Sequence, residues 1–163
     1  EKSADLLHQL GMPVVKVGSG EITNWPFLEY IARKGKPIIL STGMSYLSEV
    51  KEAVGVIRNA GNERLALLHC VSNYPADPAE VNLRSMQTML TSFHLPVGYS
   101  DHTLGVEVAL AAAALGAKII EKHFTLNKSD TTIHDHVLSA TPDEFRNMTT
   151  IGRNIFKNIS LGI

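Results

Sequence analysis

Cysteine is almost absent from this sequence, since Cys70 is the single cysteine among 163 residues. A lone cysteine excludes a disulfide within the chain and fits a reducing cytoplasm, where we expect the protein to be. Lys and Arg number 15 against 16 Asp and Glu, and no basic run occurs, so nucleic acid is not an expected partner. The longest apolar stretch, Val108 to Leu115, is too short to span a membrane, and no charged-then-apolar leader pattern occurs. We therefore expect neither a membrane location nor export.

Short apolar runs alternate with helix-length amphipathic segments along the chain, whose length suits one domain. The runs predict parallel strands that are covered on both faces. The predicted strands are Val14–Val17, Pro37–Leu40, Leu65–Leu68, Val97–Tyr99 and Lys118–Ile120. The predicted helices are Asn24–Arg33, Ser48–Asn59, Asn82–Phe93, Leu104–Leu115 and Pro142–Ile159.

The polar residues after the strands distinguish between two parallel α/β folds. A doubly wound sheet concentrates its functional residues at one switch point, whereas every predicted strand here ends in polar side chains, as in a (β/α)8 barrel. Five strands cannot close such a barrel, whose usual length is about 250 residues. We predict that residues 1–163 form the C-terminal five β/α units of a TIM (β/α)8 barrel. The chain begins at Glu1 inside a helical pattern, and we expect it to be a segment of a longer protein.

Two histidines follow successive predicted strands. One such histidine is usually a core residue that bonds to backbone carbonyls, but His102 and His123 at equivalent strand ends favour a divalent metal site. Asp101 and Glu121 are candidates for orienting the imidazoles or accepting protons. Two nitrogen ligands with oxygen or water suit Mn²⁺, Co²⁺ or Zn²⁺ better than Ca²⁺. The His-Asp-His sequence at 134–136 is a competing metal cluster, although its polar loop favours a lid that contacts substrate.

Small hydroxyl residues and glycines also gather at the predicted strand ends. Glycines let backbone N–H groups approach an anion, hydroxyls donate hydrogen bonds to it, and a lysine balances its charge. The sequence thus predicts a phosphate or carboxylate site formed by Lys16, Ser19, Ser41, Ser72 and Ser100. A Schiff-base lysine, Lys16 or Lys122, is an alternative that is typical of barrel aldolases.

Cys70 and Tyr74 follow the third predicted strand. Tyr74 could stack on a substrate or hydrogen-bond to it, or could be a turn residue fixed by Pro75. Cys70 has no activating base that the sequence places beside it, so we expect a buried, inert thiol.

Five motifs in order carry a family resemblance across essentially the whole chain. They are Lys16-Val17-Gly18-Ser19-Gly20-Glu21, Leu40-Ser41-Thr42-Gly43-Met44, Leu68-His69-Cys70-Val71-Ser72-Asn73-Tyr74-Pro75, Gly98-Tyr99-Ser100-Asp101-His102-Thr103 and Glu121-Lys122-His123-Phe124-Thr125. They closely resemble the N-acetylneuraminate (sialic acid) synthase family, which includes the legionaminate and pseudaminate synthases. The resemblance assigns the chain to strands four to eight of the barrel, without the first three β/α units and the C-terminal antifreeze-like (SAF) domain.

The resemblance implies a condensation of phosphoenolpyruvate with an N-acyl hexosamine such as N-acetylmannosamine, which releases phosphate and forms a nine-carbon 2-keto sugar acid such as N-acetylneuraminate. It implies a divalent metal held by His102 and His123, with Mn²⁺ expected first and Mg²⁺ or Co²⁺ as alternatives. The implied phosphoenolpyruvate ligands are Lys16, Ser19, Ser41, Ser72 and Ser100. Tyr74 and Asp135 match sugar-binding positions, and Glu121 and Asp101 are the expected catalytic residues. A homodimer is expected for the full-length protein.

The chain also departs from the family pattern. Ile133-His134-Asp135-His136 replaces a Gly-Pro-Asp-His sequence that is frequent in the family, and this leaves the sugar unspecified. A glutamate and a lysine from the early strands are absent, as is an arginine that a partner subunit supplies. We therefore expect the isolated segment to be inactive. The alternatives are a Schiff-base barrel aldolase and a ligand-binding barrel fragment without turnover.

Overall fold

The computed structural model describes residues 1–160 and contains one sheet of five parallel strands. The strands are β1 (Val15–Val17), β2 (Ile38–Ser41), β3 (Leu65–Cys70), β4 (Val97–Asp101) and β5 (Ile120–Lys122). Each strand pairs with the next one along the chain, in the order β1-β2-β3-β4-β5. A doubly wound sheet would reverse its order at a switch point. The prediction of a partial (β/α)8 barrel is therefore confirmed, and residues 161–163 of the predicted domain lie outside the described residues.

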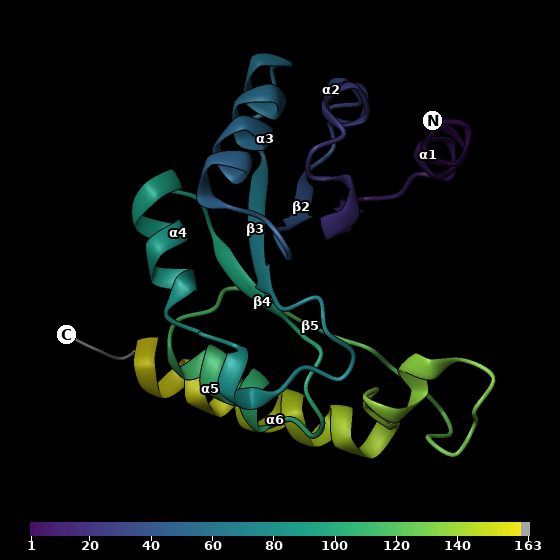
Figure 1. Cartoon of the computed structure of the whole chain (residues 1–163), viewed down its shortest axis with the longest axis vertical. Helices are drawn as coiled ribbons and strands as arrows, with labels where there is room; N and C mark the ends of the chain where they lie inside the picture. The colour runs from purple at the N-terminus through teal and green to yellow at the C-terminus, as the bar shows by residue number, and fades with distance from the viewer. Residues whose placement is uncertain (161–163) are drawn as a thin grey trace.

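The helices lie around the outside of the curved sheet, and the opposite side is open (Figure 1). They are α1 (Lys2–Gln9), α2 (Trp25–Arg33), α3 (Leu47–Asn59), α4 (Ser85–Phe93), α5 (Glu107–Ala114) and α6 (Pro142–Ser160). Short 3-10 turns occur at η1 (Ser19–Glu21), η2 (Pro78–Glu80) and η3 (His134–Val137). Among the helices of the described residues, none is long and apolar enough to cross a membrane.

The element boundaries differ from the predicted ones at several places. The helices expected from Asn82 and Leu104 begin later, because Asn82 (φ +46°) and Gly105 (φ +74°) adopt left-handed conformations that a right-handed helix cannot contain. The last strand is β5 rather than Lys118–Ile120, and β4 extends two residues beyond Tyr99. The polar residues expected after these strands are therefore partly within them.

The hydrophobic core fills the space between the sheet and the helices. Leu40 and Leu67 of the central strands are fully buried there against Leu28 and Ile57 of the helices. Because side chains alternate between the two faces of a strand, the residues between these core positions face the interior of the partial barrel. The same alternation continues to the carboxyl ends, where it determines which polar side chains share a site.

His69 lies on the helix-facing side of β3, where its Nε2 donates to the Val81 carbonyl at 2.6 Å. Burial lowers the pKa of His69 below its ordinary value, so the unfolded chain takes up a proton first as the pH falls. The free energy of unfolding should thus fall below about pH 6.5, by at most about 1.4 kcal/mol per pH unit. His69→Gln keeps a donor near Val81 but does not titrate. Urea unfolding across this pH range should show a flatter dependence for the variant, and an unchanged slope would contradict this role for His69.

Candidate functional site

A cavity of about 410 Å³ opens at the carboxyl ends of the strands. Nine of the eleven predicted site residues line it, and the other two are Asp101 and Asp135. The nine are Lys16, Ser19, Ser41, Ser72, Tyr74, Ser100, His102, Glu121 and His123. Parallel strands bring their carboxyl ends to one edge, which is where (β/α)8 barrels place their active sites.

Glu121 connects the two ends of the sheet across this cavity. Its Oε1 accepts a hydrogen bond from Ser100 Oγ at 2.7 Å and lies 3.3 Å from Lys16 Nζ. Lys16 comes from β1 and Glu121 from β5, which are the two outermost strands. Both side chains remain partly exposed, at 33% and 40%, so they are accessible to a ligand.

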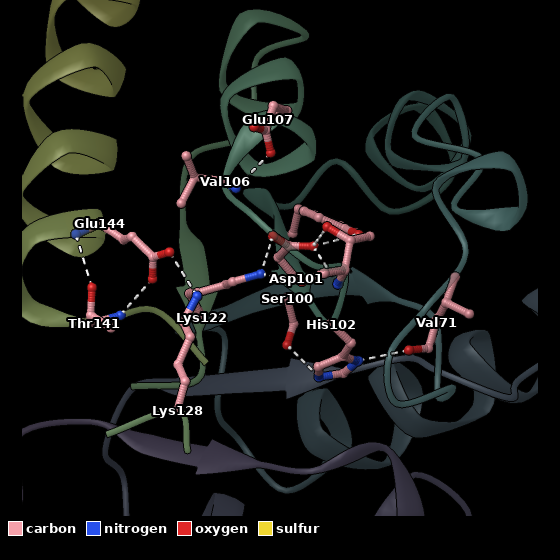
Figure 2. Close-up of polar contacts among 12 residues, drawn as sticks. Val71, Ser100, Asp101, His102, Val106, Glu107, Lys122, Lys128, Thr141 and Glu144 are labelled. Carbon is pink, nitrogen blue, oxygen red and sulfur yellow. Dashed lines mark hydrogen bonds and ion pairs between the residues drawn. The ribbon is translucent and has the colours of Figure 1, made fainter. Parts of the chain in front are cut away.

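The hydrogen bonds of His102 determine which of its nitrogens is free. Its Nδ1 lies 2.7 Å from the Val71 carbonyl oxygen, which can only accept, so Nδ1 carries the proton. The lone pair on Nε2 then faces Ser100 Oγ at 3.4 Å, whose proton is donated to Glu121. Burial lowers the pKa of His102 and favours the neutral ring. His102 is thus a neutral imidazole with one nitrogen available to a ligand (Figure 2).

Three aromatic rings meet beside this nitrogen. The centroids of His102 and His123 are 5.4 Å apart, and Tyr74 stacks on His102 at 4.2 Å. The centroids of Tyr74 and His123 are 5.8 Å apart, with the two rings nearly perpendicular. His123 Nδ1 lies 3.4 Å from Asp135 Oδ2, so the loop aspartate is beside the cavity although it does not line it. Carboxylates in this position often orient imidazoles that bind a metal.

The donor set fits a divalent metal only in part. His102 has a free nitrogen and a backbone carbonyl behind its other nitrogen, the usual arrangement of a metal ligand. Within residues 1–160, however, no group of three or more His, Cys, Asp or Glu side chains is arranged to hold an ion. The fit is therefore to two imidazoles, with oxygen from water or substrate completing the shell. The competing 134–136 cluster does not assemble: His134 bonds to the Tyr74 carbonyl, and His136 to Thr125 Oγ1.

Hydroxyl groups form the other wall of the cavity around Gly43. The backbone N–H of Gly43 donates to Ser19 Oγ at 2.9 Å, and Cys70 Sγ lies 3.2 Å from the same oxygen. A Cβ on Gly43 would lie 2.4 Å from Ser72 Oγ, so this packing leaves no room for a side chain. Ser41 Oγ is buried and has no hydrogen-bond partner. An unpaired buried hydroxyl carries a free-energy cost, which a ligand with acceptor oxygens would relieve.

Asp101 and Lys122 lie on the opposite face of the strands from the cavity. Both side chains are fully buried and form an ion pair, with Lys122 Nζ 2.8 Å from Asp101 Oδ2. Because Asp101 stands between Ser100 and His102 on an extended strand, it points away from both. Asp101, which we expected beside the imidazoles, therefore does not face a substrate in this cavity. Lys122 is equally inaccessible, which leaves Lys16 as the lysine that a Schiff-base reaction could use.

Four residues that line the cavity were not among the predicted site residues: Gly18, Gly20, Met44 and Cys70. Cys70, expected to be an inert thiol, lines the cavity, and Gly43 holds the hydroxyl groups close together. Because side chains alternate between the two faces of a strand, Cys70 is expected on the same face as Ser72, which comes two residues later. The sequence places Gly43 at a strand end but does not reveal its close packing, because the three side chains around it come from other segments.

This chain is a segment of a (β/α)8 barrel, with parallel strands in sequential order and a polar cavity at their carboxyl ends. Barrel enzymes have their active sites at this end of the strands. The model of the NeuB family matches residues 1–163, and the chain belongs to that family. It is 49% identical over 164 residues to the N,N'-diacetyllegionaminic acid synthase of Campylobacter jejuni, an alignment that covers 99% of this chain and 49% of the relative. The chain thus spans about half the length of the curated relatives it matches.

Solved structures show the same architecture. The spore coat polysaccharide biosynthesis protein SpsE of Bacillus subtilis superposes with a TM-score of 0.95 at 39% identity, covering 100% of this chain and 46% of that protein. The N-acetylneuraminic acid synthetase of Leptospira borgpetersenii, in complex with citrate, superposes at 0.93 with 37% identity, covering 98% and 55%. The family is that of the sialic and nonulosonic acid synthases, in agreement with the resemblance of the five motifs.

Proposed function

We propose that this chain forms part of a nonulosonic acid synthase that condenses phosphoenolpyruvate with an N-acyl hexosamine and releases phosphate. One observation carries the proposal: hydroxyl groups, a lysine and two imidazoles from all five strand ends share one cavity. An anion site beside a pair of imidazoles that could bind a metal suits an anionic substrate that reacts with a carbonyl compound.

The serine and lysine side chains bind phosphoenolpyruvate in this proposal. Lys16 Nζ balances the charge of the phosphate or carboxylate, and Ser19, Ser41, Ser72 and Ser100 surround its oxygens. Ser41 Oγ is buried and has no hydrogen-bond partner in the protein, so it is free to donate to the ligand. Glu121 accepts a hydrogen bond from Ser100 and lies beside Lys16, so phosphoenolpyruvate bound by these two residues lies next to the Glu121 carboxylate. That carboxylate can take a proton from attacking water.

The sugar binds on the side of the imidazoles. Tyr74 provides an aromatic face, and Asp135 an acceptor for sugar hydroxyls. His102 and His123 would hold a divalent ion, Mn²⁺ in the first place, that polarises the aldehyde oxygen when bound. The new bond joins C3 of phosphoenolpyruvate to C1 of the open-chain sugar. Water then adds at C2, and the C2–O bond to phosphate breaks.

Phosphate release by the full-length protein tests this function. The assay combines phosphoenolpyruvate, Mn²⁺ and a panel of N-acyl hexosamines, with and without a chelator. We expect phosphate release that requires both a sugar and the metal. Activity that survives the chelator, together with a borohydride-trapped substrate adduct on Lys16, would instead indicate a Schiff-base aldolase.

Ser41→Ala separates substrate binding from stability. Because Ser41 Oγ has no partner within the protein, its removal breaks no internal hydrogen bond. The free energy of unfolding should stay within about 1 kcal/mol of the wild-type value or increase. The affinity for phosphoenolpyruvate should fall about tenfold, the usual effect of a lost hydrogen bond to a charged ligand. Titration calorimetry and urea unfolding of the full-length variant measure the two quantities, and an unchanged affinity would remove Ser41 from the binding site.

A further inference from the structure

The pairing between β4 and β5 ends immediately before the two histidines of the cavity. Asp101 and Lys122 are the last residues of the two strands and stand opposite each other in the register. His102 and His123 follow them by one residue. The backbone hydrogen bonds between β4 and β5 therefore end before the two histidines, so other contacts have to fix the position of one imidazole relative to the other.

Side-chain bonds at this last pair form a closed network on the far side of the strands. Asp101 Oδ2 accepts from Lys122 Nζ at 2.8 Å, while Oδ1 accepts from Thr103 N, Thr103 Oγ1 and Tyr99 Oη at 3.0, 2.8 and 3.2 Å. Lys122 Nζ also donates to the Thr103 carbonyl oxygen at 2.5 Å. Figure 2 shows Lys122 reaching Asp101, while His102 extends in another direction toward Val71.

These bonds fix the backbone on both sides of His102. Asp101 precedes it, and both the N–H and the carbonyl of Thr103, which follows it, are held by the pair. Lys122 in turn holds β5 one residue before His123. A buried ion pair adds little stability compared with packed apolar side chains of similar size, because the desolvation of both charges offsets their attraction. What apolar side chains cannot supply is the set of directional bonds.

We propose that Asp101 and Lys122 are positioning residues that hold His102 and His123 in the geometry needed to bind one divalent ion. The inference rests on the proposed function, because it takes the two imidazoles as metal ligands. It assigns Asp101 and Lys122 no contact with substrate. Their effect passes through the backbone at the ends of the two strands.

The test measures Mn²⁺ binding to the full-length protein, without substrate, by electron paramagnetic resonance of the free ion. The double variant Asp101→Asn with Lys122→Met removes both charges and leaves neither one unpaired in the core. We expect it to unfold cooperatively on heating and to bind Mn²⁺ at least tenfold more weakly, as is usual when groups that orient metal ligands are replaced. Lys128→Met is the control, since it breaks a lysine–carboxylate pair of similar length, Lys128 Nζ to Glu144 Oε1 at 2.7 Å, that lies away from the cavity. It should bind Mn²⁺ like the wild type.

The outcomes separate this inference from the proposed function. A folded double variant with wild-type affinity for Mn²⁺ would overturn the positioning role, even if its melting temperature fell. A wild-type protein that does not bind Mn²⁺ would overturn the metal part of the proposed function, and the inference with it. If the double variant does not fold, Thr103→Val removes one donor to Asp101 without exposing a charge. It should weaken Mn²⁺ binding in the same direction by a few-fold, and an unchanged affinity would again contradict the proposal.

Discussion

Replacement of His102 by alanine in the full-length protein will abolish metal-dependent phosphate release, with a loss of about 10³-fold or more in kcat. A bound divalent ion contributes several kcal/mol to the stabilisation of developing charge, and about 1.4 kcal/mol corresponds to tenfold in rate. The same loss is expected for His123→Ala, because the two rings lie close together on adjacent strand ends. Steady-state phosphate release at several Mn²⁺ concentrations measures the effect.

A histidine outside the cavity provides the control. His94 is exposed at the end of α4 in a left-handed conformation (φ +52°) that asparagine also adopts readily. His94→Asn should therefore keep full activity. Full metal-dependent activity in either His102→Ala or His123→Ala would show that the ligand assignment is wrong.

The second large effect is expected from Gly43→Ala. The new Cβ would lie 2.4 Å from Ser72 Oγ and 2.9 Å from both Cys70 Sγ and Ser19 Oγ, so these groups have to move. Overpacking of this kind costs about 1–3 kcal/mol. Because the displaced hydroxyl groups are those that bind the anion in the proposed function, the affinity for phosphoenolpyruvate should fall about tenfold or more.

Gly55→Ala is the matched control for this substitution. A Cβ on Gly55 meets no atom within 4 Å, and the residue lies inside α3, where alanine is favoured over glycine. This variant should gain about 0.5–1 kcal/mol of stability and keep wild-type affinity for phosphoenolpyruvate. Calorimetric titration and thermal unfolding distinguish the two variants. Equal affinities for Gly43→Ala and Gly55→Ala would disprove a role for Gly43 in shaping the anion site.

The sequence predicted the strand order and most of the cavity because both follow from local pattern. Apolar runs identify buried parallel strands, and the residue after each run lies at the same edge of the sheet. Ser41, Ser100 and His102 could be placed in this way from their neighbours alone.

The residues that could not be placed depend on details finer than the pattern of apolar runs. Asp101 was expected beside the imidazoles because the predicted strand ended at Tyr99, whereas β4 continues and its alternation turns Asp101 toward the helices. The boundary of β5 was likewise shifted, so the partner of Asp101 was not evident. Asp135 reaches His123 through the fold of a loop, which no periodicity in the sequence specifies.

The contact between Lys16 and Glu121 has a consequence for how the molecule assembles. All strand pairings join neighbours along the chain, so each closes only a short loop and costs little chain entropy. Lys16 and Glu121, in contrast, come from opposite ends of the sheet and can meet only when all four pairings and the curvature of the sheet are in place. The two histidines can approach each other as soon as the last two units have formed. In the proposed function, the two imidazoles that would hold the metal therefore need only the pairing of β4 with β5, whereas the anion site needs the whole curved sheet.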